Sequence, residues 1–106
     1  MRYVSTRGSA PELGFCDVLL AGLATDGGLY LPEKWPALAA LSATRSYAET
    51  AAAVMSPFVG DEIPAVTFSA LCADAYATFR HDAVVPLVQI GANEWLLEQF
   101  LSLIHI

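Results

Sequence analysis

Residues 26–32 read Asp26-Gly27-Gly28-Leu29-Tyr30-Leu31-Pro32, a turn followed by a short extended segment. Asp-Gly-Gly is typical of a turn because glycine reaches positive φ without strain. The extended piece stops at Pro32, and a connector punctuated by a second proline runs on to Pro36. This segment therefore separates a short N-terminal unit from the helices that follow it.

Two elements are predicted before the turn. Residues 2–7 alternate loosely between apolar and polar side chains, which indicates a short strand, and residues 8–14 are a loop with glycine at both ends. A helix follows, because apolar residues and one glycine recur at the spacing of one helical face. These residues are Phe15, Val18, Leu19, Gly22 and Leu23.

Up to three helices are predicted after the connector. The first is a short apolar helix over residues 37–41. The second begins near Ser46 and ends at Gly60, and Pro64 suits the first turn of the third. The third helix has the cleanest apolar stripe of the chain, which we expect in the core, with Arg80 and His81 at its C-terminal end. The stripe consists of Phe68, Leu71, Cys72, Ala75 and Phe79.

The pattern changes from helical to extended after His81. Residues 84–90 are rich in β-branched side chains, and Pro86 among them favours an edge position or an early strand residue. Residues 91–93 form a turn, and residues 94–100 form a second strand. Because two strands alone are marginal in water, this hairpin needs more sheet or a helical layer to cover it.

The expected fold class is therefore α/β or α+β. A small α-rich domain, with a short N-terminal strand and three to four helices, occupies residues 1–81. Residues 82–100 form a C-terminal β-hairpin that would join a larger sheet.

Composition and charge exclude several classes of partner. The 106 residues carry a formal net charge of -6, and the five basic residues are scattered along the chain. Nucleic acids and anionic membrane surfaces are bound by basic patches, so we expect neither partner. No apolar run reaches the roughly 18 residues of a membrane span, and the N-terminus lacks the apolar core of a secretory signal, so we expect a cytoplasmic protein.

The two cysteines are interpreted as reduced, buried thiols, because Cys16 and Cys72 both fall on apolar stripes. A metal site or a catalytic cysteine would need further ligands or a positioned base. Neither His81 nor His105 supplies such a spacing, so no metal site is predicted.

Several segments, taken in order, resemble the threonine synthase family. They are Tyr3 to Gly8, Phe15 to Ala24, Asp26 to Pro32, Phe58 to Pro64, and Trp95 to Glu98. Many members carry serine in place of Cys16. Each segment alone is weak, but the ordered set is specific, and the resemblance covers residues 1–100.

The resemblance implies a pyridoxal-phosphate enzyme of the tryptophan-synthase-like class, which converts O-phospho-L-homoserine and water to L-threonine and phosphate. It further implies that this N-terminal domain packs against a catalytic domain. In such enzymes a lysine forms the Schiff base and the cofactor acts as the electron sink. The parent would be a phosphate-eliminating lyase of threonine biosynthesis.

The resemblance ends after Phe100. Family members continue with His-Gly-Pro-Thr and then Phe-Lys-Asp, whereas this chain ends Leu101-Ser102-Leu103-Ile104-His105-Ile106. The cofactor lysine would fall two residues past the end. We therefore expect residues 101–106 to be a non-family tail and an artefact, and we assign no role to His105. We expect the fragment itself to bind no cofactor and to be inactive, with no catalytic, cofactor-binding or metal residue.

Three residues are candidates for a substrate-facing edge. Ser5, Thr6 and Arg7 offer hydroxyls and a guanidinium that suit phosphate oxygens. The favoured alternative is the polar end of a strand, with Arg7 paired to a nearby carboxylate. A second group of three aromatic residues is predicted to anchor the interface with the catalytic domain. They are Tyr30, Trp35 and Tyr47.

Two polar features have an ordinary structural interpretation. The turn at residues 26–28 could place N–H groups near a ligand, but such a turn more often only redirects the chain. Asp61 and Glu62 could act as acid or base in a shielded pocket. Adjacent acids at a helix start are more often solvated, and they favour the helix dipole.

The alternative function is a free-standing interaction module that shares the N-terminal fold. In that case the high apolar fraction would form a surface for a partner.

Overall fold

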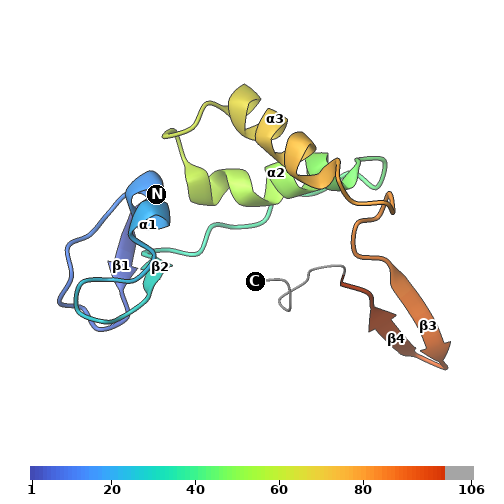
Figure 1. Cartoon of the computed structure of the whole chain (residues 1–106), viewed down its shortest axis with the longest axis horizontal. Helices are drawn as coiled ribbons and strands as arrows, with labels where there is room; N and C mark the ends of the chain where they lie inside the picture. The colour runs from blue at the N-terminus through green and yellow to red at the C-terminus, as the bar shows by residue number, and fades with distance from the viewer. Residues whose placement is uncertain (100–106) are drawn as a thin grey trace.

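The computed structural model describes residues 1–99, which form three parts in chain order (Figure 1). The N-terminal lobe holds β1 (Tyr3–Ser5), α1 (Phe15–Ala21) and β2 (Tyr30–Pro32). The helix pair consists of α2 (Tyr47–Val59) and α3 (Ala65–Tyr76), and the hairpin of β3 (Leu87–Gly91) and β4 (Glu94–Leu97). This arrangement confirms the expected mixed fold with three helices, an N-terminal strand and a C-terminal hairpin. The division at residue 81 stays a prediction, and the predicted tail at 101–106, with His105, lies outside the described residues.

The N-terminal lobe is closed by a short antiparallel pair of strands. Tyr3 faces Pro32, Val4 faces Leu31 and Ser5 faces Tyr30. Tyr3 also bridges to Leu13, whose carbonyl accepts a hydrogen bond of 2.9 Å from the Tyr3 N–H. The turn at residues 26–28 thus brings the extended segment that follows it back onto the first strand.

The helix α1 is present but buries little of its apolar stripe. It ends at Ala21, because Gly22 adopts a φ of 70° and terminates it. Leu19 and Leu23 of the predicted face are 67% and 63% exposed, and no residue of α1 is fully buried. The helical spacing therefore predicted the element, but within residues 1–99 this face is covered only in part: Phe15 and Val18 are half-buried, whereas Leu19 and Leu23 are exposed.

The helix α2 begins and ends where the sequence indicates. The Ser46 hydroxyl accepts a 3.2 Å hydrogen bond from the Glu49 N–H, and the Glu49 carboxylate accepts one of 2.8 Å from the Ser46 N–H. This reciprocal capping box satisfies two N–H groups that the helix leaves free. At the other end, Gly60 has a φ of 67° and caps the helix.

Two helix predictions are wrong. Residues 37–41 are irregular rather than helical, because so short a segment is unstable as a helix without tertiary contacts. The third helix ends at Tyr76, so Arg80 and His81 lie beyond it. Pro64 precedes its first turn as the N-cap.

The core of the described chain is small, and the predicted stripe on α3 is only partly inside it. Cys72 is buried, and Phe68 and Phe79 are half-buried. Leu71 is 52% exposed and Ala75 is exposed, which corrects their placement in the core. Within the described chain α3 packs mainly against one helix, α2. It therefore buries a narrower apolar stripe than a helix with two neighbours would.

The hairpin extends away from the helix pair (Figure 1). Leu87 pairs with Leu97 and Val88 with Leu96, and a bulge interrupts the register after Gln89. Pro86 lies just before β3, as its missing N–H requires.

No helix among residues 1–99 is long and apolar enough to cross a membrane.

Candidate functional site

The Asp26 carboxylate organises the polar end of the N-terminal lobe. It accepts hydrogen bonds from the Ser5 hydroxyl at 2.8 Å, from the Ser9 N–H at 2.9 Å and from the Gly28 N–H at 2.9 Å. Residues from β1, from the loop after it and from the turn before β2 thus converge on one carboxylate. We call this cluster of Ser5, Ser9, Asp26 and Gly28 the Asp26 junction.

The two glycines of the turn are required by the geometry of this junction. Gly27 has a φ of 80°, which is strained for other residues. No residue with a side chain fits at position 28. A Cβ there would lie 2.5 Å from the Ser5 hydroxyl oxygen and 2.9 Å from that of Thr6. The Asp-Gly-Gly sequence therefore lets the backbone approach the end of β1 closely.

Opposing effects act on the pKa of Asp26. Desolvation by burial acts to raise this pKa, but hydrogen bonds from the Gly28 N–H, the Ser5 hydroxyl and the N–H groups of Ser9 and Ala10 lower it. The net pKa is below the ordinary value of 3.8. The carboxylate is therefore the form that the folded lobe selects.

Asp26→Asn should weaken the acid dependence of stability. Because the folded-state pKa lies below the unfolded one, the charged carboxylate stabilises the fold above about pH 4, and this contribution disappears as the pH falls through the folded pKa. The variant should be less stable than wild type at pH 7, and the difference should shrink by pH 2–3. Urea unfolding followed by circular dichroism at both pH values measures it. Asp74→Asn, at an exposed position on α3, is the control; a constant difference across this pH range would contradict the assignment.

The structure places the three predicted substrate-facing residues at this junction. Ser5 is buried, and its hydroxyl is bound to Asp26. The Thr6 hydroxyl accepts a 3.0 Å hydrogen bond from the Leu29 N–H. Arg7 is exposed, and its guanidinium donates to the Asp26 main-chain carbonyl at 3.0 Å rather than to a carboxylate. Contact with substrate stays a prediction for all three, of which Thr6 and Arg7 are exposed and Ser5 is buried.

Two side chains join the N-terminal lobe to the helix pair. The Tyr3 hydroxyl donates a 2.6 Å hydrogen bond to the Phe58 carbonyl near the end of α2. Burial first, and then the negative charge of Glu62, raise the pKa of Tyr3, so this hydroxyl stays protonated. The Glu62 carboxylate accepts hydrogen bonds from the Phe15 N–H and, at 3.4 Å, from the Cys16 N–H. It therefore caps α1 from the α2–α3 loop.

Sequence reasoning missed this role of Glu62. The local pattern predicts a solvated acid that favours the helix following it, whereas Glu62 accepts hydrogen bonds from the N-terminus of a helix 46 and 47 residues earlier in the chain. One local signal existed: Gly14, the N-cap of α1, has no capping side chain. A Cβ at Gly14 would lie 2.7 Å from a Glu62 carboxylate oxygen, so this glycine also admits the acid.

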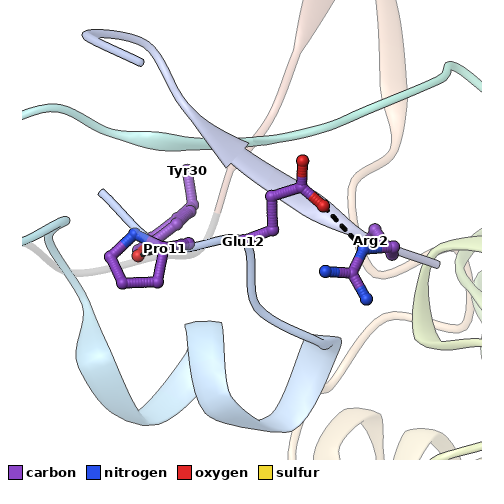
Figure 2. A network of polar contacts seen from close by, with 4 residues as sticks. All are labelled: Arg2, Pro11, Glu12 and Tyr30. Carbon is purple, nitrogen blue, oxygen red and sulfur yellow. Dashed lines mark hydrogen bonds and ion pairs between the residues drawn. The ribbon is translucent and has the colours of Figure 1, made fainter. Parts of the chain in front are cut away.

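The predicted interface aromatics occupy three different environments. Tyr30 is half-buried and donates a 2.9 Å hydrogen bond to the Pro11 carbonyl, beside the exposed Arg2–Glu12 ion pair (Figure 2). Trp35 is 73% exposed and meets Phe58 edge-on. Tyr47 packs against Tyr76 with ring centroids 4.8 Å apart. Of the three, Trp35 has the most exposed side chain, and a role at a domain interface stays a prediction for each.

The comparisons with known proteins match this architecture. The family model described as threonine synthase N terminus matches residues 2–76, which include β1, α1, β2, α2 and α3. The chain belongs to the threonine synthase family. This confirms the resemblance carried by the ordered segments, and it identifies the chain with the N-terminal region of threonine synthase.

Relatives extend the match into the hairpin. A threonine synthase from Pseudomonas aeruginosa is 51% identical over 104 residues, covering 94% of this chain and 22% of its own length. One from Methylobacillus glycogenes is 45% identical over 110 residues, covering 92% and 23%. The crystal structure of PLP-bound threonine synthase from Brucella melitensis is 57% identical, with a TM-score of 0.84, over 92% of this chain and 22% of that one. The chain thus spans about a fifth of the length of these threonine synthases.

Proposed function

We propose that this chain acts as the N-terminal domain of a pyridoxal-phosphate-dependent threonine synthase, in which the whole protein converts O-phospho-L-homoserine and water to L-threonine and phosphate. The observation that carries the proposal is the match to threonine synthases over more than nine-tenths of the chain. The cofactor is named for the Brucella relative and is carried to the whole protein by this similarity. A cytoplasmic location is part of the proposal.

The cofactor chemistry belongs to residues other than those described here. Pyridoxal phosphate is held through a lysine, and when bound it supplies the electron sink. Lys34 is the sole lysine of the 106 residues, and it is exposed on the irregular connector after β2. It has no enclosing site of the kind that a buried cofactor needs, so the described residues do not fit the group.

The role that we assign to this region is structural, through packing on the catalytic domain. Large apolar side chains are exposed on every part of the described chain, among them Leu20, Trp35, Leu71 and Trp95. Exposed apolar patches of this kind mark interaction surfaces. Trp35, Tyr30 and Tyr47 remain the proposed anchors. Ser5, Thr6 and Arg7 remain the proposed substrate-facing residues, and of these Thr6 and Arg7 are exposed.

A chimera tests the proposal. The matching N-terminal region of the Pseudomonas aeruginosa enzyme would be replaced by residues 1–99 of this chain. We expect phosphate release from O-phospho-L-homoserine at a rate of the same order as the parent enzyme, and no release from a version that lacks the N-terminal region. A soluble chimera that binds pyridoxal phosphate but releases no phosphate from this substrate would contradict the proposal.

The alternative function is a free-standing interaction module. One observation favours it, namely that the leucines of α1 are exposed. It predicts that the 106-residue chain is monodisperse and melts cooperatively. The domain proposal predicts instead that the isolated chain aggregates or binds a dye for apolar surfaces.

A further inference from the structure

An open cavity lies at the end of the helix pair where α2 begins and α3 ends (Figure 1). Its volume is about 290 Å³, close to the lower limit that is usual for small-molecule sites. Three aromatic rings, an imidazole, a carboxylate and a valine contribute to its wall. These residues are Tyr47, Tyr76, Phe79, His81, Asp82 and Val84.

The three aromatic rings form a concave wall. Tyr47 and Tyr76 have ring centroids 4.8 Å apart and planes inclined by 79°, and Tyr76 and Phe79 have centroids 5.9 Å apart and planes inclined by 50°. Because the planes are inclined to one another, the rings make a corner rather than a flat stack. The face of an aromatic ring carries negative charge density and attracts a cation within about 6 Å. Such a corner therefore suits a positively charged ligand.

The charge at the cavity is also negative. No lysine or arginine among residues 1–99 lines it, and the Asp82 carboxylate makes no ion pair with another residue of this range. The Nδ1 atom of His81 accepts a 3.1 Å hydrogen bond from the Ala83 N–H, a role that only the neutral imidazole can fill. Asp82 is therefore the charged group that the cavity offers to a ligand.

A strained turn holds Asp82 beside the rings. Val84 is 4% exposed and has a φ of 59°, which is unusual for a β-branched residue. Its N–H donates a 2.8 Å hydrogen bond to the His81 carbonyl, so the backbone turns back immediately after α3. Strained positions persist where the surrounding structure fixes them, and they are frequent at ligand sites. The carboxylate and the aromatic corner thus come from segments whose relative position is fixed.

We propose that this cavity binds a small organic cation of the alkylammonium class, with the positive charge against the three rings and the Asp82 carboxylate. The inference goes beyond the proposed function and does not rest on it, because none of these residues belongs to the Asp26 junction. An anionic ligand would be repelled by Asp82. A metal ion would lack ligands, since no cluster of three His, Cys, Asp or Glu side chains able to hold one occurs among residues 1–99.

Choline and its uncharged isostere 3,3-dimethyl-1-butanol test the inference in the chimera described above. The two probes share a shape and differ in charge. Isothermal titration calorimetry should therefore show about tenfold tighter binding of choline. Equal affinity for the two probes, or no detectable binding of choline at millimolar concentration, would overturn the inference.

Asp82→Asn removes the charge and keeps the size of the side chain. Because Asp82 is exposed, the substitution should leave the chimera folded and weaken choline binding by about threefold, with no change for the alcohol. Asp74→Asn is the matched control, since Asp74 is an exposed acid of α3 that does not line the cavity. If the two variants bound choline equally well, the carboxylate of Asp82 would have no part in the site, and the inference would be wrong.

Hydrogen exchange locates the ligand without any substitution. Choline should slow exchange of the amides of residues 81–84 and leave those of residues 26–29 unchanged. Slower exchange only in the catalytic domain would show that choline binds elsewhere, which contradicts the inference. If choline binds at residues 81–84 but the chimera releases no phosphate from O-phospho-L-homoserine, the proposed reaction is wrong while the inference stands. Phosphate release without choline binding has the opposite meaning.

Discussion

Tyr3→Ala should destabilise the chain by about 3–5 kcal/mol, the usual cost of removing a buried aromatic ring. Tyr3 is 7% exposed, and its ring packs against Phe15 with centroids 6.3 Å apart. The substitution leaves a cavity where β1 meets α1 and removes the hydrogen bond to the Phe58 carbonyl. Because small domains have roughly 5–15 kcal/mol of stability in total, urea unfolding should show a much lower midpoint or no folded baseline.

Tyr3→Phe is the matched control, because it keeps the ring and removes the hydroxyl. It should cost about 0.5–1.5 kcal/mol, the net value of one hydrogen bond. If the alanine and phenylalanine variants unfolded at the same urea concentration, the ring would not be part of the core, and the packing of β1 against α1 would be contradicted.

Gly28→Ala should have the second largest effect, about 1–3 kcal/mol, because it overpacks the Asp26 junction. The added Cβ would lie 2.5 Å from the Ser5 hydroxyl oxygen, 2.9 Å from the Thr6 hydroxyl oxygen and 3.0 Å from an Asp26 carboxylate oxygen. All three atoms are already held by hydrogen bonds, so none moves without losing one. Thermal unfolding followed by circular dichroism should show the loss.

Gly8→Ala separates this steric effect from the general cost of replacing glycine. Gly8 has a φ of 76°, but no atom lies within 4 Å of its Cβ position. Its substitution should cost about 1 kcal/mol from backbone strain alone. The two variants also differ in pH response, because only Gly28→Ala disturbs the carboxylate of Asp26. A smaller loss for Gly28→Ala than for Gly8→Ala would contradict the close approach at the junction.

The elements that the sequence by itself determined have local causes. Asp26-Gly27-Gly28 produced a turn because its backbone conformation and its hydrogen bonds lie within a few residues. Ser46 started α2 through a bond to Glu49, and Gly60 ended it. The ordered segments also determined the family. For the turn and for α2, the deciding interaction joins residues that are close in sequence. For the family, the deciding pattern lies in the sequence itself.

The tertiary structure alone decided which faces are covered and which distant groups meet. Glu62 caps α1, Tyr3 reaches Phe58, and Val84 is buried with a φ of 59°, unusual for a β-branched residue; none of these follows from local pattern. The exposure of Leu71 shows the limit most clearly. Periodicity tells which side chains share a face, but burial depends on whether another element packs there, and that is a property of the assembled chain.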